Sequence, residues 1–158
     1  MQKKLQKLLE QAYELCEDGN YVRALEYYDI VLDIETDNLN VMVDKGVTLQ
    51  NLGHFNEALQ MYEKALDIEE ENLDALINKG SVLHTLKKYS EAISCYDAVL
   101  DHDKRNTMAL AYKGLSIGEM GNVPSAIKYF KKALRMDQDY DLAQISLLTA
   151  KNILKNVS

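Results

Sequence analysis

Apolar residues recur along this chain at spacings of three and four, which gathers their side chains on one face of an α-helix. One such face carries Leu76 and Leu83, and a second face shortly downstream carries Ala92, Tyr96 and Val99. A tight turn separates the two segments. The pattern therefore predicts pairs of amphipathic helices, each pair joined by a short turn.

The helix pair repeats at a fixed interval along the chain, equal to the number of residues from Gly46 to Gly80. No copy contains an insertion or a deletion. Equivalent positions in the four copies form four columns of residues. The small-residue column is Ala12, Gly46, Gly80 and Gly114, and the alanine column is Ala24, Ala58, Ala92 and Ala126. The aromatic column is Tyr28, Tyr62, Tyr96 and Phe130, and the turn column is Gly19, Gly53, Lys87 and Gly121. A fixed period of this length is the signature of a stacked helical repeat. We expect a single domain over residues 1–158, with copies at about 5–38, 39–72, 73–106 and 107–140 and a closing helix at about 141–156.

Glycine occupies an unfavourable position in three of the predicted first helices. Gly46, Gly80 and Gly114 lie inside these helices, where glycine costs roughly 1 kcal/mol relative to alanine. We expect close packing within each pair to compensate for this cost. The alanine column would let the two backbones approach, and the aromatic column would fill the space beside them.

These columns resemble the tetratricopeptide repeat family, whose pattern is W-x-x-L-G-x-x-Y, then A-x-x-x-F, then alanine and proline. The resemblance covers roughly residues 5–140. The chain departs from the family pattern in having lysine where the family has leucine, no closing proline, and apolar residues in place of tryptophan at Leu8, Met42, Leu76 and Leu110. The resemblance implies an all-α fold, a right-handed α-solenoid of four helix-turn-helix repeats with a C-terminal capping helix.

The two ends of the chain carry polar residues where the middle copies carry apolar ones. Lys7, Glu14 and Asp18 occupy columns that pack on a preceding copy elsewhere, which predicts an N-terminal cap. The last predicted helix keeps a backward-packing face of Ala143, Leu147, Ala150 and Leu154. Leu148 is left on its outer side, so a monomer and a weak C-terminal dimer both stay open.

Composition narrows the classes of partner. The net charge is -7 and the isoelectric point is near 5.0, which disfavours nucleic acid and anionic membranes because both reward clustered lysine and arginine. Residues 1–72 carry ten net negative charges, because they contain sixteen acidic and six basic residues. The chain shows no apolar signal region and no membrane-spanning run, so we expect a cytoplasmic protein with Cys16 and Cys95 as reduced thiols.

Candidate catalytic chemistry is absent from the pattern. His54, His84 and His102 show no metal-ligand spacing, and no phosphate-binding loop or nucleophile motif occurs. We expect no enzymatic activity, no metal and no cofactor, and we interpret the three histidines as incidental surface residues.

A lysine column could be mistaken for a binding stripe. Lys45, Lys79 and Lys113 occupy equivalent positions in successive copies, but each can bury its methylenes and pair with an acid of the preceding copy. The expected partners are Asp33, Asp67 and Asp101. No anionic ligand is needed to explain this column.

The resemblance implies a concave groove formed by the remaining face of the first helices. The predicted groove residues are Leu9, Glu10, Tyr13, Asn40, Val43, Asp44, Val47, Ile77, Asn78, Met108, Tyr112, Leu115, Leu142 and Ile145. The first half of this set is acidic and rich in amides, and the second half is apolar.

The groove suggests another protein as the partner. Some members of the family hold the C-terminal carboxylate of chaperones with lysine, asparagine and arginine, but only Asn78 matches here, so this role is disfavoured. We hypothesise an apolar or amphipathic peptide or helix whose basic residues face Glu10, Asp44 and Asp74. Two alternatives stay open, namely that the groove column is internal packing without a ligand, and that the chain is a self-associating scaffold.

Overall fold

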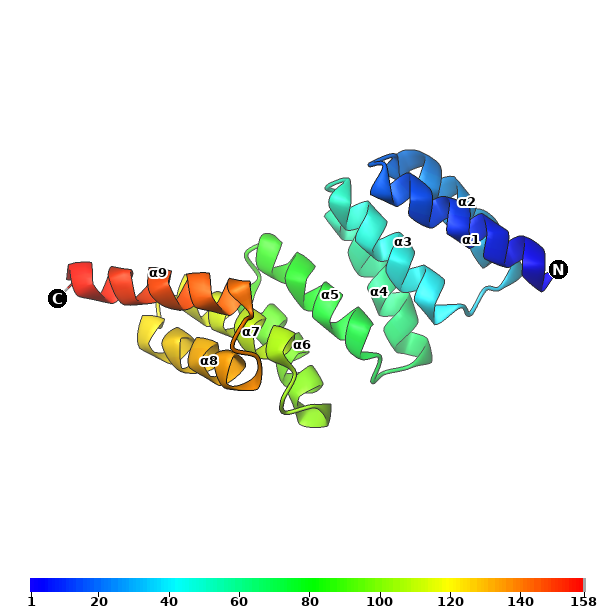
Figure 1. Cartoon of the computed structure of the whole chain (residues 1–158). Helices are drawn as coiled ribbons and strands as arrows, with labels where there is room; N and C mark the ends of the chain where they lie inside the picture. The colour runs from blue at the N-terminus through cyan, green and yellow to red at the C-terminus, as the bar shows by residue number, and fades with distance from the viewer. Residues whose placement is uncertain (158) are drawn as a thin grey trace. The chain divides into compact units, whose positions relative to one another are not determined.

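The computed structural model describes residues 1–157, and these residues form nine α-helices and no strand. The helices are α1 (Gln2–Glu17), α2 (Tyr21–Ile34), α3 (Leu39–Asn51), α4 (Phe55–Ile68), α5 (Leu73–Thr85), α6 (Tyr89–His102), α7 (Thr107–Glu119), α8 (Val123–Met136) and α9 (Asp141–Val157). Consecutive helices pack as pairs, as Figure 1 shows for α1 with α2 and for α7 with α8. The predicted all-α fold of helix-turn-helix repeats is confirmed.

The start of each of three first helices is fixed by the same capping residue. Asn38 accepts a hydrogen bond from the Val41 backbone N–H at 3.1 Å, and Asn72 and Asn106 make the same bond with Ala75 (2.9 Å) and with the residue at position 109 (3.0 Å). A side chain that caps in this way satisfies one of the backbone donors left free in the first helical turn. The cap recurs at the start of the second, third and fourth copies but not at α1, whose N-cap is Met1, so α3, α5 and α7 begin in register.

The predicted turn column is also confirmed. Gly19, Gly53 and Gly121 have φ values of +76°, +79° and +92°, and Lys87 takes the same place with φ +61°. Glycine adopts this left-handed conformation without steric cost, whereas lysine does not. The third turn therefore keeps the shape of the others under backbone strain.

The chain divides into two compact units, and the division falls inside α5. The first unit, Met1–Val82, contains α1 to α4 and most of α5. Its core includes Leu5, Ala12, Ala24, Tyr28, Val31 and Val41. In this unit α1 packs on α2, α2 on α3 and α3 on α4, so the core lies between successive amphipathic faces.

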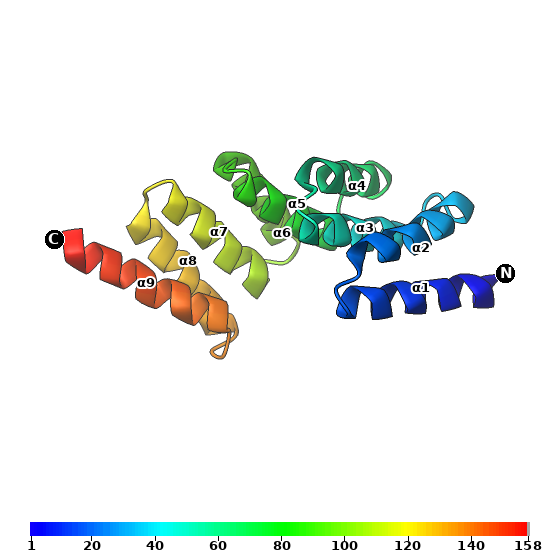
Figure 2. The same ribbon diagram turned by 90° about the horizontal axis from the view of Figure 1, so that it is seen from above.

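The second unit begins at Leu83 and contains α6 to α9. In this unit α9 packs on α8 and also touches α7, and Figure 2 shows these three helices side by side. Ala143, Leu147 and Ala150 face the core as predicted. Leu154 was expected on the same face but is 37% exposed.

Close packing does compensate for the helix glycines, although its geometry differs from the prediction. A β-carbon added at Gly114 would lie 2.7 Å from the Phe130 ring, and one added at Gly46 would overlap the Tyr62 ring. The aromatic side chain thus lies directly over the glycine, not beside it. The alanine column is buried as expected, with Ala58 fully buried.

The lysine column pairs one helical turn away from the expected acids. Lys45 lies 2.6 Å from Asp29, and Lys79 lies 3.8 Å from Glu63. Lys113 pairs in the same way with Asp97, at 2.5 Å. The predicted partners Asp33, Asp67 and Asp101 were therefore wrong, whereas the structural role expected for the lysines is confirmed.

Candidate functional site

The predicted groove residues of the first unit do not share one degree of exposure. Tyr13 is 44% exposed, Glu10 and Asn40 are exposed, and Leu9, Val43, Asp44, Val47 and Asn78 are half-buried. Ile77 is only 8% exposed. The open part of this face is therefore made by residues of α1 and α3, together with the exposed Asp74 of α5.

A hydrogen bond joins two of these side chains across successive first helices. The Tyr13 hydroxyl donates to Asp44 Oδ2 at 2.9 Å. Burial raises the pKa of Tyr13 to about 12, helped by Asp44. Burial also raises the pKa of Asp44, the Tyr13 hydrogen bond opposes that shift, and the Asp74 carboxylate reinforces it. The face therefore presents partly desolvated negative charge beside an exposed aromatic ring.

Asn78 is already engaged within its own helix. Its side-chain N–H donates to the backbone carbonyl of Asp74 at 2.8 Å. The side chain thus has one donor fewer for the backbone of a peptide than the sequence suggests, and Asn40 is the more accessible amide of the two.

A repeated polar bridge fills the space between neighbouring first helices, and sequence reasoning missed it. Gln50 Nε2 donates to Ser81 Oγ at 3.2 Å. His84 Nδ1 lies 2.8 Å from Ser116 Oγ, and Cys16 Sγ lies 3.5 Å from a threonine hydroxyl of α3. Cys16, Gln50 and His84 are equivalent positions of successive copies, so one column supplies the bridge each time.

The bridging column also contacts the aromatic column. The Tyr62 hydroxyl donates to Gln50 Oε1 at 3.1 Å, and the Tyr28 hydroxyl lies 3.8 Å from Cys16 Sγ. His84 is half-buried and bonded, not an incidental surface residue, and burial lowers its pKa while the Glu119 carboxylate opposes that shift.

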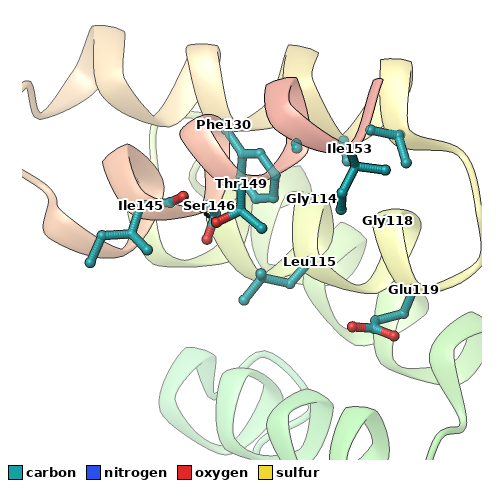
Figure 3. A pocket seen from close by; sticks show the side chains of 12 residues that line it. Gly114, Leu115, Gly118, Glu119, Phe130, Ile145, Ser146, Thr149 and Ile153 are labelled. Atoms are coloured by element: carbon teal, nitrogen blue, oxygen red, sulfur yellow. Dashed lines mark hydrogen bonds between the residues drawn. The ribbon is translucent and has the colours of Figure 1, made fainter. Parts of the chain in front are cut away.

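The fourth repeat lacks both parts of this arrangement. The bridging column ends at Gly118 and the aromatic column at Phe130, which have no side chain and no hydroxyl, respectively. A pocket of about 310 Å³ lies beside them. Figure 3 shows it between α7 and α9. Its lining residues are Gly114, Leu115, Gly118, Glu119, Val123, Ala126, Phe130, Ile145, Ser146, Thr149, Ala150 and Ile153.

Two predicted groove residues of the second unit, Leu115 and Ile145, line this pocket. The other three lie elsewhere: Met108 is exposed, Tyr112 packs edge-to-face on an aromatic ring of α6, and Leu142 packs against a core cluster. The prediction omitted the other ten lining residues, among them Gly118 and Glu119. A second glycine in α7, where the other copies have larger side chains, was the available signal.

The described residues give no sign of metal chemistry or of a membrane span. No three His, Cys, Asp or Glu side chains within residues 1–157 lie together as metal ligands would. None of the helices described in that range is both long and apolar enough to cross a bilayer.

Paired helices that recur with one period, with a polar bridge or a pocket between successive first helices, define a helical-repeat protein. Models of the tetratricopeptide repeat match residues 5–42, 52–113 and 86–141. The chain belongs to the tetratricopeptide repeat family, as its residue columns predicted. No match was found among curated proteins.

Solved structures share the fold at low sequence identity. The crystal structure of MamA protein superposes with a TM-score of 0.80 at 19% identity, over 96% of this chain and 83% of that chain. A tetratricopeptide repeat protein from Parabacteroides merdae gives 0.81 at 23% identity, with 98% and 61% covered. The first repeat domain of Spaghetti (RPAP3), bound to the HSP90 peptide SRMEEVD, gives 0.70 at 22% identity, with 74% and 93% covered. The fold supports a protein–protein interaction role in general terms.

Proposed function

We propose that this chain is an interaction module that binds an amphipathic peptide or helix of another protein through the open faces of its first helices. Binding, and not catalysis, is the activity proposed. The apolar part of the ligand contacts Tyr13, Val43 and Val47, and its basic residues face Glu10, Asp44 and Asp74. An amphipathic helix laid in an apolar groove is a common mode of recognition by helical proteins.

The arrangement around Asp44 carries this proposal. Asp44 is held by Tyr13, lies near a second carboxylate, and is partly removed from water. A positively charged ligand group near this site would relieve the repulsion between Asp44 and Asp74, and such interactions are stronger where solvent is partly excluded. The acidic excess of residues 1–72 favours the same sign of partner.

The peptide bound to the Spaghetti domain differs in charge from the ligand proposed for this chain. Its bound peptide, SRMEEVD, carries three acidic residues and one arginine. Glu10, Asp44 and Asp74 would repel such a segment, and the lysine and arginine of the family's carboxylate clamp are missing here. We therefore propose a basic ligand and not an acidic one.

The test is selection of short random peptides on the immobilised chain, followed by affinity measurement with synthetic copies. Charge reversal with Glu10→Lys and Asp74→Lys, both at exposed positions, is expected to weaken binding roughly three- to thirty-fold. The control reverses the exposed Glu26 and Glu57 of the second helices and should leave binding unchanged. Selected peptides that are acidic, or that bind both double variants equally, would overturn the proposal.

Self-association is the second candidate, and one observation favours it. Leu148 and Ile153 of α9 are 63% and 47% exposed, and exposed apolar side chains are a surface on which two copies could associate. Sedimentation equilibrium at rising concentration tests it directly. A dimer that Leu148→Glu converts to a monomer would support this candidate, and a monomer at every concentration would exclude it.

A further inference from the structure

We propose that the α7–α9 pocket is a specificity site that receives one large apolar side chain of a partner segment, next to a lysine or arginine of that segment. The inference rests on the proposed interaction function but concerns a different set of residues, which belong to the second unit. It names what the bound segment must contain.

The space in the pocket arises from the residue at position 118. The equivalent residues Gln50 and His84 reach the next first helix and bond there. Gly118 has no side chain with which to do this, and the residue equivalent to Ser81 is Thr149, on the opposite wall. The absence of one bridging side chain leaves the pocket open.

Packing does not require glycine at position 118. An added β-carbon would make ordinary contact with the Ala126 β-carbon at 3.5 Å, whereas at Gly114 it would lie 2.7 Å from the Phe130 ring. The two glycines of α7 therefore differ in kind. Gly114 makes room for a core side chain, and Gly118 makes room for the pocket.

The lining of the pocket determines the chemistry of its occupant. Leu115, Phe130, Ile145 and Ile153 provide apolar walls, and Glu119 is the one charged side chain among the described residues that line it. Figure 3 places Ile145 and Glu119 at opposite ends, with Leu115 between them. An apolar group that fills the middle would therefore bring its neighbouring group near a carboxylate, which favours a cation.

The size and exposure of the pocket favour a side chain presented by a larger molecule. A volume of about 310 Å³ lies at the lower end of ligand sites, which typically span ~300–1,000 Å³ and enclose most of their ligand. Ile145 is 66% exposed at the rim, so this pocket is open and would leave a free small molecule largely uncovered. A peptide can cover the rim with its own backbone and neighbouring residues.

The defined probes are the blocked dipeptides acetyl-Leu-Lys-amide, acetyl-Leu-Glu-amide and acetyl-Ala-Lys-amide, titrated into the labelled full chain and followed by NMR. We expect acetyl-Leu-Lys-amide to shift the Leu115, Ile145 and Ile153 methyl signals saturably. The alanine probe should give no saturable shift. The glutamate probe should bind roughly two- to five-fold more weakly, as expected for the loss of one exposed ion pair.

Two substitutions of the same glycine provide a matched pair. Gly118→Gln introduces the side chain found at Gln50, with Thr149 placed to accept its hydrogen bond, and should abolish the shifts. Gly118→Ala raises the helix propensity at this position about as much as Gly118→Gln does. It leaves the pocket open, so the probe should still bind. Glu119→Lys should reverse the preference between the lysine and glutamate probes, and Glu119→Gln should remove it.

Several outcomes would overturn the inference. It fails if no probe gives saturable shifts, if Gly118→Gln binds as the wild type does, or if the alanine probe binds as well as the leucine probe. If these methyl signals instead shift with protein concentration alone, and Gly118→Gln removes that shift, a second copy of the chain occupies the pocket. According to the proposed function, the selected peptides depend for binding on the acidic residues around Asp44. If these peptides bind the wild type and Gly118→Gln equally, the pocket inference fails and the proposed function still holds.

Discussion

Gly114 of α7 lies directly beneath the ring of Phe130 of α8, so that a β-carbon at 114 would stand 2.7 Å from the ring. Contacts this short force a shift of the ring or of the backbone. Filling a packed core in this way typically costs ~1–3 kcal/mol.

The first prediction compares the two glycines of α7. Gly114→Ala is expected to lower the free energy of unfolding by about 1–2 kcal/mol, because steric overlap outweighs the gain in helix propensity. Gly118→Ala should raise it by about 0.5–1 kcal/mol, since its β-carbon meets only ordinary contact. Urea unfolding followed by circular dichroism measures both. Changes of the same sign would contradict the assignment.

The second prediction concerns the strained turn between α5 and α6. Lys87 has φ +61°, a conformation that costs a non-glycine residue roughly 1–2 kcal/mol. Lys87→Gly removes that strain but gains freedom in the unfolded chain, so we expect a net stabilisation of about 0.5 kcal/mol. Lys87→Ala keeps the strain and serves as the control. A thermal midpoint that rises equally for both variants would show that strain is not the cause.

The third prediction ranks the repeated ion pairs. The Lys113 side chain is 15% exposed and lies 2.5 Å from Asp97, whereas Lys79 is 27% exposed and lies 3.8 Å from Glu63. Asp97→Asn removes the carboxylate that pairs with the less exposed lysine and leaves its ammonium with the Tyr129 ring, so it should destabilise the chain by about 1 kcal/mol. Glu63→Gln should change stability by less than about 0.3 kcal/mol. Chemical denaturation at low salt distinguishes the two, and equal effects would refute the ranking.

The fourth prediction is a pH dependence at Asp44. Burial raises the pKa of Asp44 in the folded state above its unfolded value. The folded state therefore binds the proton more tightly, and this group favours folding at pH values below its unfolded pKa. That contribution is lost as the pH rises through the folded pKa. At neutral pH the Asp44 charge consequently costs stability.

Asp44→Asn removes that charge and should stabilise the chain at neutral pH. The gain over wild type should shrink as the pH falls through the raised folded pKa, and it should be lost below the unfolded pKa of about 3.9. Unfolding free energies measured across this range give the comparison. Glu10→Gln, at an exposed position on the same face, is the control and should show no such trend. A gain that is constant with pH would contradict the linkage.

The fold was predictable because local and global signals agree from copy to copy. The asparagine caps, the turn glycines and the aromatic column each recur at the same period, so each independently places the same helix boundaries. The positive φ of Lys87 follows the same rule, because Lys87 lies in the same column as the turn glycines. Its position in the repeat, and not its residue type, fixed its backbone.

The periodicity of the sequence was not sufficient to predict which acidic residues pair with the lysine column. The predicted Asp33 and the observed partner Asp29 have equivalents in later copies, so the period alone could not choose between them. Antiparallel geometry chooses: Lys45 lies about one and a half turns into α3, and Asp29 about one and a half turns before the end of α2. Counting outward from the turn would have given the correct acid.

The position of a residue in a repeat column does not determine how exposed its side chain is. Ile77 and Ile145 occupy the same column, yet they are 8% and 66% exposed. A column fixes the direction of a side chain from its own helix, but the neighbouring side chains decide how much water reaches it. Ile77 is therefore a poor choice for a groove substitution, because a charge there would disturb folding as well as binding.

The bridging column that ends at Gly118 makes the space between neighbouring first helices depend on one side chain in each copy. Replacing Gln50 by glycine would remove the side chain that bonds Ser81 and hollow out the same place in the first unit. It would also take away the acceptor of the buried Tyr62 hydroxyl and place a glycine near the end of α3, so we expect it to lower the free energy of unfolding by about 1–3 kcal/mol. In the fourth copy the aromatic residue is Phe130, which has no hydroxyl, so the open pocket leaves no such group without an acceptor.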